Sequence, residues 1–178
     1  MGKVNRRDHL AERCYYRGRR PQVEALEGRH LLATFTVVNS DDSGPGSLRG
    51  AIEQANADPA PDTIAFDPAV AGTITLLSGL PVLSTDMVLE GPGASVLTVA
   101  RSAAPGTPEF PIFAVGTGTL PVVRTDLEVA ISGLTLTGGQ STLSGGILNA
   151  GTLTLTDFII SNSSGCTFQE LTEVRPPV

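Results

Sequence analysis

The sequence contains little of the material from which most catalytic and metal sites are built. Its 178 residues include two histidines, two cysteines and no tryptophan, and aromatic residues make up 4% of the chain. Cys14 and Cys166 are too few for a disulfide framework or a tetrahedral zinc site. His9 and His30 both lie near the N-terminus, which excludes a histidine-based catalytic cluster from the rest of the chain.

Charge and long apolar runs are also scarce. Charged residues make up 17% of the chain, and no apolar run approaches the ~20 residues of a membrane-spanning helix. The net charge of −6 is unevenly distributed, because residues 1–30 hold eight of the twelve basic residues. The acidic remainder would repel the phosphates of a nucleic acid. We therefore expect no membrane span and no nucleic-acid partner.

Composition divides the chain into three segments. Residues 1–33 form a basic leader or targeting segment without sustained apolar periodicity. Residues 34–165 alternate short apolar runs with Gly, Pro, Ser, Asn and Asp, which is typical of short strands and turns. Residues 166–178 fit no part of that pattern. We expect a frame change or premature end near Gly165, with a polar C-terminal cap as the alternative.

One helix is predicted in the second segment, over residues 47–57. Ser47 is a natural N-cap, and Asp58-Pro59 ends the helix because proline cannot continue it. The apolar residues at helical spacing are Leu48, Ala51, Ile52 and Ala55. Gly50 stands where a glutamate would complete a capping box, so Gly50→Glu is predicted to stabilise the helix.

Strand pairs near the end of the second segment repeat with a shift of 24 residues. The shift superposes Val129, Ile131, Leu134 and Leu136 on Leu153, Leu155, Phe158 and Ile160. A further strand is expected at Gly145–Asn149, with a matching strand at Ile112–Val115. Short strands that recur at this period predict an all-β solenoid, a parallel β-helix with coils of about 24 residues. The helix at 47–57 would cover its N-terminal end.

Two parts of this segment resemble known families. Residues 36–66 resemble the N-terminal cap of CSLREA-type right-handed parallel β-helix proteins. The residues that match that motif are Ser47, Leu48, Arg49 and Ala51. Residues 131–139 and 145–149 are similar to coils of polymorphic outer-membrane protein repeats. The resemblance implies a right-handed parallel β-helix in a secreted or surface-attached protein, and it implies no reaction.

The leader carries a resemblance of its own. It is similar to the LEPR-XLL-type N-terminal segment of planctomycete surface and secreted proteins. The matching residues are Leu26, Glu27, Arg29, Leu31 and Leu32, while Gly28 replaces the proline of that pattern. This resemblance implies export, and hence an extracellular or cell-surface location.

Catalytic β-helices that act on polysaccharides use carboxylates clustered on neighbouring coils, often with calcium or an arginine. The candidates in this chain are Arg124, Asp126, Glu128 and Asp157. The 24-residue shift places Gly133 beside Asp157, so no acidic partner is expected there. The Asp41-Asp42 turn lacks the alternating ligand spacing of a calcium loop. We therefore assign no catalytic, cofactor-binding or metal-binding residue, and no cofactor.

These observations predict a non-catalytic extracellular or cell-surface β-helix protein with a structural, adhesive or binding role. Its partner would be a cell-surface polysaccharide or a protein, and exposed strand edges would allow self-association. The alternative is a carbohydrate-active enzyme of the polysaccharide lyase or glycoside hydrolase kind. An outward pair of carboxylates on stacked strands would favour that enzyme.

Overall fold

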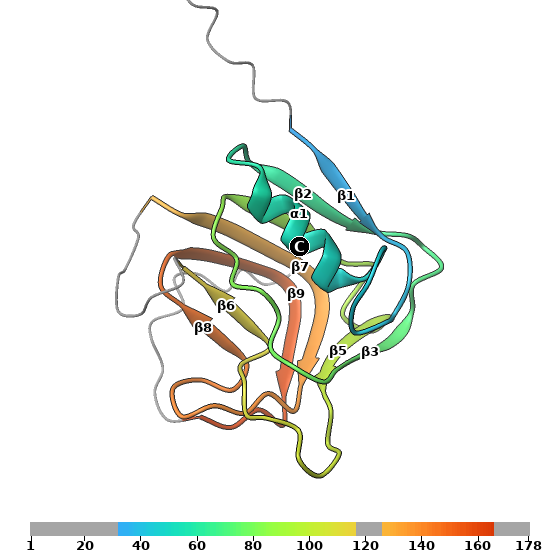
Figure 1. Ribbon diagram of the computed structural model, residues 1–178, viewed down its shortest axis with the longest axis vertical. Coiled ribbons are helices and arrows are strands. Elements are labelled where there is room, and N and C mark those ends of the chain that lie inside the picture. The colour runs from blue at the N-terminus through green and yellow to red at the C-terminus, as the bar shows by residue number, and fades with distance from the viewer. Residues whose placement is uncertain (1–31, 117–125, 166–178) are drawn as a thin grey trace, which may run out of the picture.

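The computed structural model describes residues 32–116 and 126–165, and it forms one curled sheet with a single short helix (Figure 1). The elements are β1 (Thr34–Val37), α1 (Leu48–Ala57), β2 (Asp62–Phe66), β3 (Gly72–Leu76), β4 (Met87–Glu90), β5 (Leu97–Arg101), β6 (Phe113–Val115), β7 (Glu128–Thr137), β8 (Ile147–Asn149) and β9 (Thr152–Ser161). Every pairing between these strands is parallel.

The main sheet is organised around the long strand β7. Its order is β1-β2-β4-β7-β5-β3, and β9 also pairs with β7. The first half of β7 lies beside β4 and its second half beside β5, so that both short strands share one long neighbour. The sheet curls as a result into an open half-barrel, and β6 and β8 form a separate two-stranded sheet (Figure 1).

The core follows from the alternation of apolar and polar residues along the strands. In β2, β3, β4 and β5 the apolar residues at every second position are buried, while their neighbours are more exposed. The inward residues include Ile64, Ile74, Leu89 and Val99, all at 0% exposure. These side chains form one hydrophobic cluster on the concave side of the sheet.

The predicted helix is confirmed within one residue. Its apolar stripe is buried, and the helix packs against β1 and β2 (Figure 1). The Ser47 hydroxyl accepts a hydrogen bond from the backbone N–H of Gly50 at 3.1 Å, which is the expected N-cap. The chain leaves the helix at Asp58 in extended conformation, before Pro59.

The expected benefit of Gly50→Glu is not supported by the packing around Gly50. A Cβ atom there would lie 2.9 Å from the backbone oxygen of Gly44, closer than real Cβ contacts. We now expect Gly50→Glu to lower the free energy of unfolding by about 1 kcal/mol, because the clash outweighs the gain from a capping box. Urea denaturation of the variant beside the wild type measures this change. A raised midpoint would show that the loop at Gly44 yields without cost.

The predicted solenoid is wrong. The structure is a single curled open sheet with sparse strands, and it is not a right-handed parallel β-helix with coils of about 24 residues. The 24-residue spacing holds between β7 and β9, but Met87 of β4 pairs with Val129, 42 residues later. A third face is represented only by the three-residue strands β6 and β8. Without a regular coil the strands cannot close into a continuous tube.

Local features of that prediction are nevertheless confirmed. Val129 pairs with Leu153 and Leu136 with Ile160, as the 24-residue shift requires. The strand expected within residues 112–115 pairs with the strand at 147–149. Short-range pattern therefore identified most strands and two of their partners, but it did not determine how the sheet closes.

One strand edge of the sheet remains open within the described residues. There, β9 pairs with β7 alone among the strands, and Ile159 and Ile160 are exposed near its end. Self-association through such an edge stays a prediction. Over residues 32–116 and 126–165, no helix has the length and apolar character needed to cross a bilayer.

Candidate functional site

The carboxylates considered from the sequence do not come together. Asp126 and Glu128 are exposed at the start of β7, and Arg124 lies outside the described residues. Glu128 pairs with Thr152, whereas Asp157 follows five residues later along β9. At ~3.3 Å per residue this separates Glu128 from Asp157 by roughly 16 Å, beyond the ~5–10 Å of a glycosidase pair.

Asp157 instead serves the bend that β7 and β9 share. It has a positive φ of 47°, and Gly133, its counterpart in the repeat, has a φ of 64°. A side chain at Gly133 would collide with the backbone oxygen of Gly91 at 2.4 Å, so glycine is required there. The Asp157 carboxylate accepts a hydrogen bond from the N–H of Ala94 at 3.2 Å. Its contact is therefore structural.

The acidic turn at Asp41-Asp42 also has a structural explanation. The Asp42 carboxylate accepts hydrogen bonds from Arg49 at 3.0 Å and from the N–H of Leu77 at 3.1 Å. The guanidinium of Arg49 donates further bonds to the backbone oxygens of Asp42, Ser78 and Gly79. Arg49 thus joins the helix to two loops. No group of three or more potential metal ligands occurs among the residues that the structure describes.

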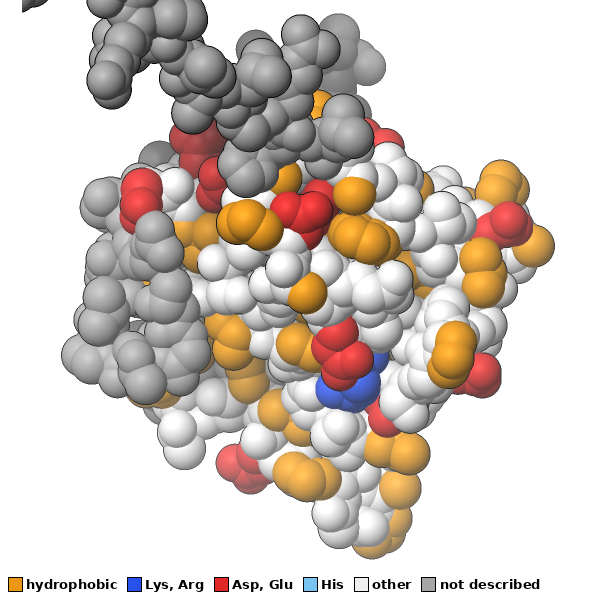
Figure 2. All heavy atoms as spheres, turned by 45° about the horizontal axis from the view of Figure 1, so that its top comes forward, with side chains coloured by type: hydrophobic (Ala, Val, Ile, Leu, Met, Phe, Trp, Pro, Cys, Tyr) orange, Lys and Arg blue, Asp and Glu red, His pale blue; other side chains and the backbone are white. Residues whose placement is uncertain are grey.

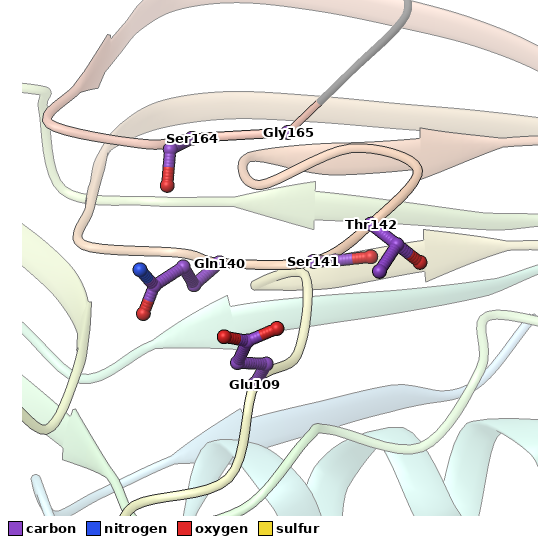
Figure 3. Close-up of a pocket in the computed structure, with 6 residues that line it drawn as sticks. All are labelled: Glu109, Gln140, Ser141, Thr142, Ser164 and Gly165. Atoms are coloured by element: carbon purple, nitrogen blue, oxygen red, sulfur yellow. The ribbon is translucent and has the colours of Figure 1, made fainter.

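A shallow polar hollow is the best candidate site in the described part of the chain (Figure 3). It has a volume of about 410 Å³. The residues that line it are Glu109, Gln140, Ser141, Thr142, Ser164 and Gly165. They come from three separate segments: the loop before β6, the loop between β7 and β8, and the chain that follows β9. Its volume falls within the usual range for ligand sites, although it is open to solvent.

Backbone hydrogen bonds hold these three segments together. The N–H of Gln140 donates to the oxygen of Phe110 at 2.9 Å, and that of Ser141 donates to the oxygen of Ser164 at 3.2 Å. The N–H of Ser164 in turn donates to the oxygen of Gly139 at 3.0 Å. The lining residues are thus attached to a paired backbone, which gives the hollow a defined shape.

Glycines allow the loops beneath the hollow to approach closely. A Cβ atom at Gly139 would lie 1.8 Å from the oxygen of Gly145, and one at Gly145 would lie 2.4 Å from the oxygen of Gly139. Both glycines are buried. Any side chain at either position would push the two loops apart, because the colliding atoms belong to the backbone.

The lining offers hydrogen-bonding groups that the protein does not use. Among the described residues, the side chains of Glu109, Gln140, Thr142 and Ser164 form no hydrogen bond, whereas the hydroxyl of Ser141 accepts one from Leu143. Figure 3 shows the Glu109 carboxylate pointing toward the segment of Gln140 and Ser141. A carboxylate, an amide and hydroxyls together can bind the hydroxyl groups of a polar ligand.

Sequence reasoning missed this hollow. The residues Gln140, Ser141 and Thr142 followed a Gly-Gly pair, and they were interpreted as a turn between strands. Glu109 and Ser164 are far from them in sequence, and only the backbone bonds of the folded chain bring them close. The polar run between Gly138-Gly139 and Gly145-Gly146 was the one available signal.

Hydroxyl groups also line the outer face of the sheet. Thr73, Thr98 and Thr135 lie in register on β3, β5 and β7, and the predicted outward threonines Thr152 and Thr154 are exposed on β9. Some of these hydroxyls serve the fold, since Thr135 donates to the oxygen of Ala94 at 2.6 Å. The face is polar but carries few charges.

The charged groups of the described residues are mostly acidic. Figure 2 shows acidic side chains at several places on the face it draws and basic side chains at one place. Arg49 and Arg101 are the basic side chains within the described ranges, and both donate to nearby backbone oxygens. Comparison with known proteins gave no match to any family model, curated protein or solved structure. The family resemblances noted in the sequence therefore stay predictions.

Proposed function

We propose that this chain is a non-catalytic binding protein that holds a polar, hydroxyl-rich ligand, such as a segment of cell-surface polysaccharide, in the hollow at Glu109 and Gln140. The observation that carries the proposal is the set of unused polar side chains around that hollow. An open hollow suits part of a longer polymer better than an enclosed small molecule. Sugar hydroxyls both donate and accept, which matches the carboxylate, amide and hydroxyls of the lining.

The lining supports binding rather than cleavage. Glu109 is the single carboxylate among its residues, whereas glycoside hydrolysis ordinarily uses two carboxylates about 5–10 Å apart. The polysaccharide lyase or glycoside hydrolase reading therefore gains no support from this hollow. The role we propose is structural or adhesive, at the cell surface or outside the cell. The basic leader and its resemblance to export segments are the support for that location.

A glycan array probed with the full chain tests the proposal, with Glu109→Gln as the site variant. We expect the wild type to bind at least one class of polysaccharide and Glu109→Gln to bind it about tenfold more weakly. That loss corresponds to one charge-assisted hydrogen bond of ~1.5 kcal/mol.

Glu90→Gln is the matched control, because Glu90 is an exposed carboxylate on β4, outside the lining of the hollow. It makes the same chemical change and should leave binding as in the wild type. If no polysaccharide binds, or if both variants lose binding equally, the proposed function is wrong.

A further inference from the structure

The carboxylate of Asp62 is buried and only half satisfied. Asp62 begins β2 and is 2% exposed. Its Oδ1 atom accepts a hydrogen bond from the backbone N–H of Ala33 at 3.1 Å, but its Oδ2 atom is buried without any hydrogen-bond partner. A buried carboxylate oxygen without a donor is costly, so this arrangement calls for a further donor or a positive charge at the same place.

Ala33 is positioned to supply both. Its N–H faces Asp62, and its oxygen accepts a hydrogen bond from the N–H of Thr63 at 2.9 Å. Both backbone groups of Ala33 are therefore held against the start of β2. The preceding residue, Leu32, is 74% exposed. The chain thus passes from an exposed residue to an anchored one across a single peptide bond.

We propose that the Leu32–Ala33 bond is a maturation site, and that the ammonium group freed at Ala33 binds the carboxylate of Asp62. An external endopeptidase would hydrolyse the bond with water. The carbonyl of Leu32 gains the oxygen as a carboxylate, and the nitrogen of Ala33 becomes an α-ammonium. That nitrogen lies where the amide nitrogen lies now, but it carries three hydrogens in place of one.

The new ammonium group would complete the site. Its extra hydrogens can reach Oδ2 while one continues to bind Oδ1, and its positive charge balances the buried carboxylate. An α-amino group has a pKa of about 7.7–8.0 in the absence of a partner, and an adjacent carboxylate favours its charged form. Cleavage would therefore fasten β1 to the sheet by an ion pair that the uncut chain lacks.

The start of β1 also fits the needs of a protease. β1 is an edge strand, with β2 as its one strand partner in the sheet. Endopeptidases bind their substrates in extended form, commonly by adding a strand to an open edge. The exposed Leu32 and the first residues of β1 are already extended.

Two cleavable variants of the full chain test the ammonium site. In the first, Arg29→Ile, His30→Glu, Leu31→Gly and Leu32→Arg create an Ile-Glu-Gly-Arg sequence, so that a protease specific for it leaves Ala33 as the first residue. In the second, Leu26→Ile creates the same sequence three residues earlier and leaves His30 first. The two cut proteins differ only in whether the new ammonium group coincides with the amide that now faces Asp62.

The reactivity of the new amine and the melting temperature are measured before and after cutting. We expect the Ala33 amine to react with an acylating reagent at least tenfold more slowly than the His30 amine. Cutting should raise the melting temperature by about 3–6 °C in the first variant and leave it unchanged in the second. Adding Asp62→Asn to the first variant should return its amine to the rate of the control. Equal labelling rates, or no rise in melting temperature, overturn the ammonium site.

N-terminal sequencing of the protein recovered from the cells that make it tests the maturation step. We expect the sequence to begin Ala-Thr-Phe, from Ala33. An intact N-terminus, or one that begins at any other residue, overturns the proposed cleavage. Neither experiment depends on polysaccharide binding, so each can fail without the proposed function.

Discussion

Replacing Ile52 by aspartate is expected to lower the free energy of unfolding by more than about 4 kcal/mol and to abolish a cooperative transition in urea. Ile52 is 0% exposed and belongs to the helix stripe that packs on β1 and β2. The substitution removes about 1.5–3 kcal/mol of apolar burial and places a carboxylate where no donor can reach it. Circular dichroism and intrinsic fluorescence during urea titration measure the change.

Gln54→Asp is the matched control for this variant. Gln54 lies two residues away on the exposed face of α1, where an added carboxylate remains in water. We expect its effect to stay within about 1 kcal/mol, the scale of helix propensity. If Ile52→Asp unfolds at the same urea concentration as Gln54→Asp, the helix does not cover the core of the sheet.

Gly139→Ala is expected to lower the free energy of unfolding by about 2–4 kcal/mol and to abolish ligand binding in the hollow. The added Cβ atom would lie 1.8 Å from the oxygen of Gly145 and 3.0 Å from a side-chain carbon of Ile112. The loop that carries Gln140 would have to move away from its neighbour. The backbone bonds from Gln140 and Ser141 would then lengthen or break. Thermal unfolding and the glycan array measure the two effects.

Gly79→Ala separates this steric effect from the general cost of replacing a glycine. A Cβ atom at Gly79 would meet Phe110 at 3.4 Å, which is ordinary van der Waals contact. We expect that variant to unfold within about 1 kcal/mol of the wild type and to bind as well. Should Gly139→Ala match it in both measurements, the hollow does not depend on close contact between the two loops.

The sequence contained enough information to locate the helix and most strands. The apolar stripe through Leu48 and Ile52 identified the helix, and alternation at Val129 and Ile131 identified one half of β7. The 24-residue shift correctly paired Val129 with Leu153, because a parallel register superposes equivalent inward residues. These signals are local, or they join two adjacent segments of equal length.

The closure of the sheet required information that one repeat does not carry. A single 24-residue shift was extended to the whole segment, but the connection between β4 and β7 is much longer. The hollow was missed for a similar reason, since Glu109 and Ser164 meet Gln140 only through the folded backbone. Asp62 did carry a signal. It stands two residues before Ile64 and four before Phe66, which places it on the inward face of β2.

Titration of an oligosaccharide from the bound polysaccharide class into the isotope-labelled full chain, followed by NMR, tests the proposed function most directly. We expect the amide signals of Gln140, Ser141, Thr142 and Ser164 to shift together, in step with saturation. We also expect the anomeric signals of the sugar to keep their intensities, since the ligand is held and not cleaved. Shifts confined to other strands, or new signals from reducing ends, would contradict a non-catalytic binding site at this hollow.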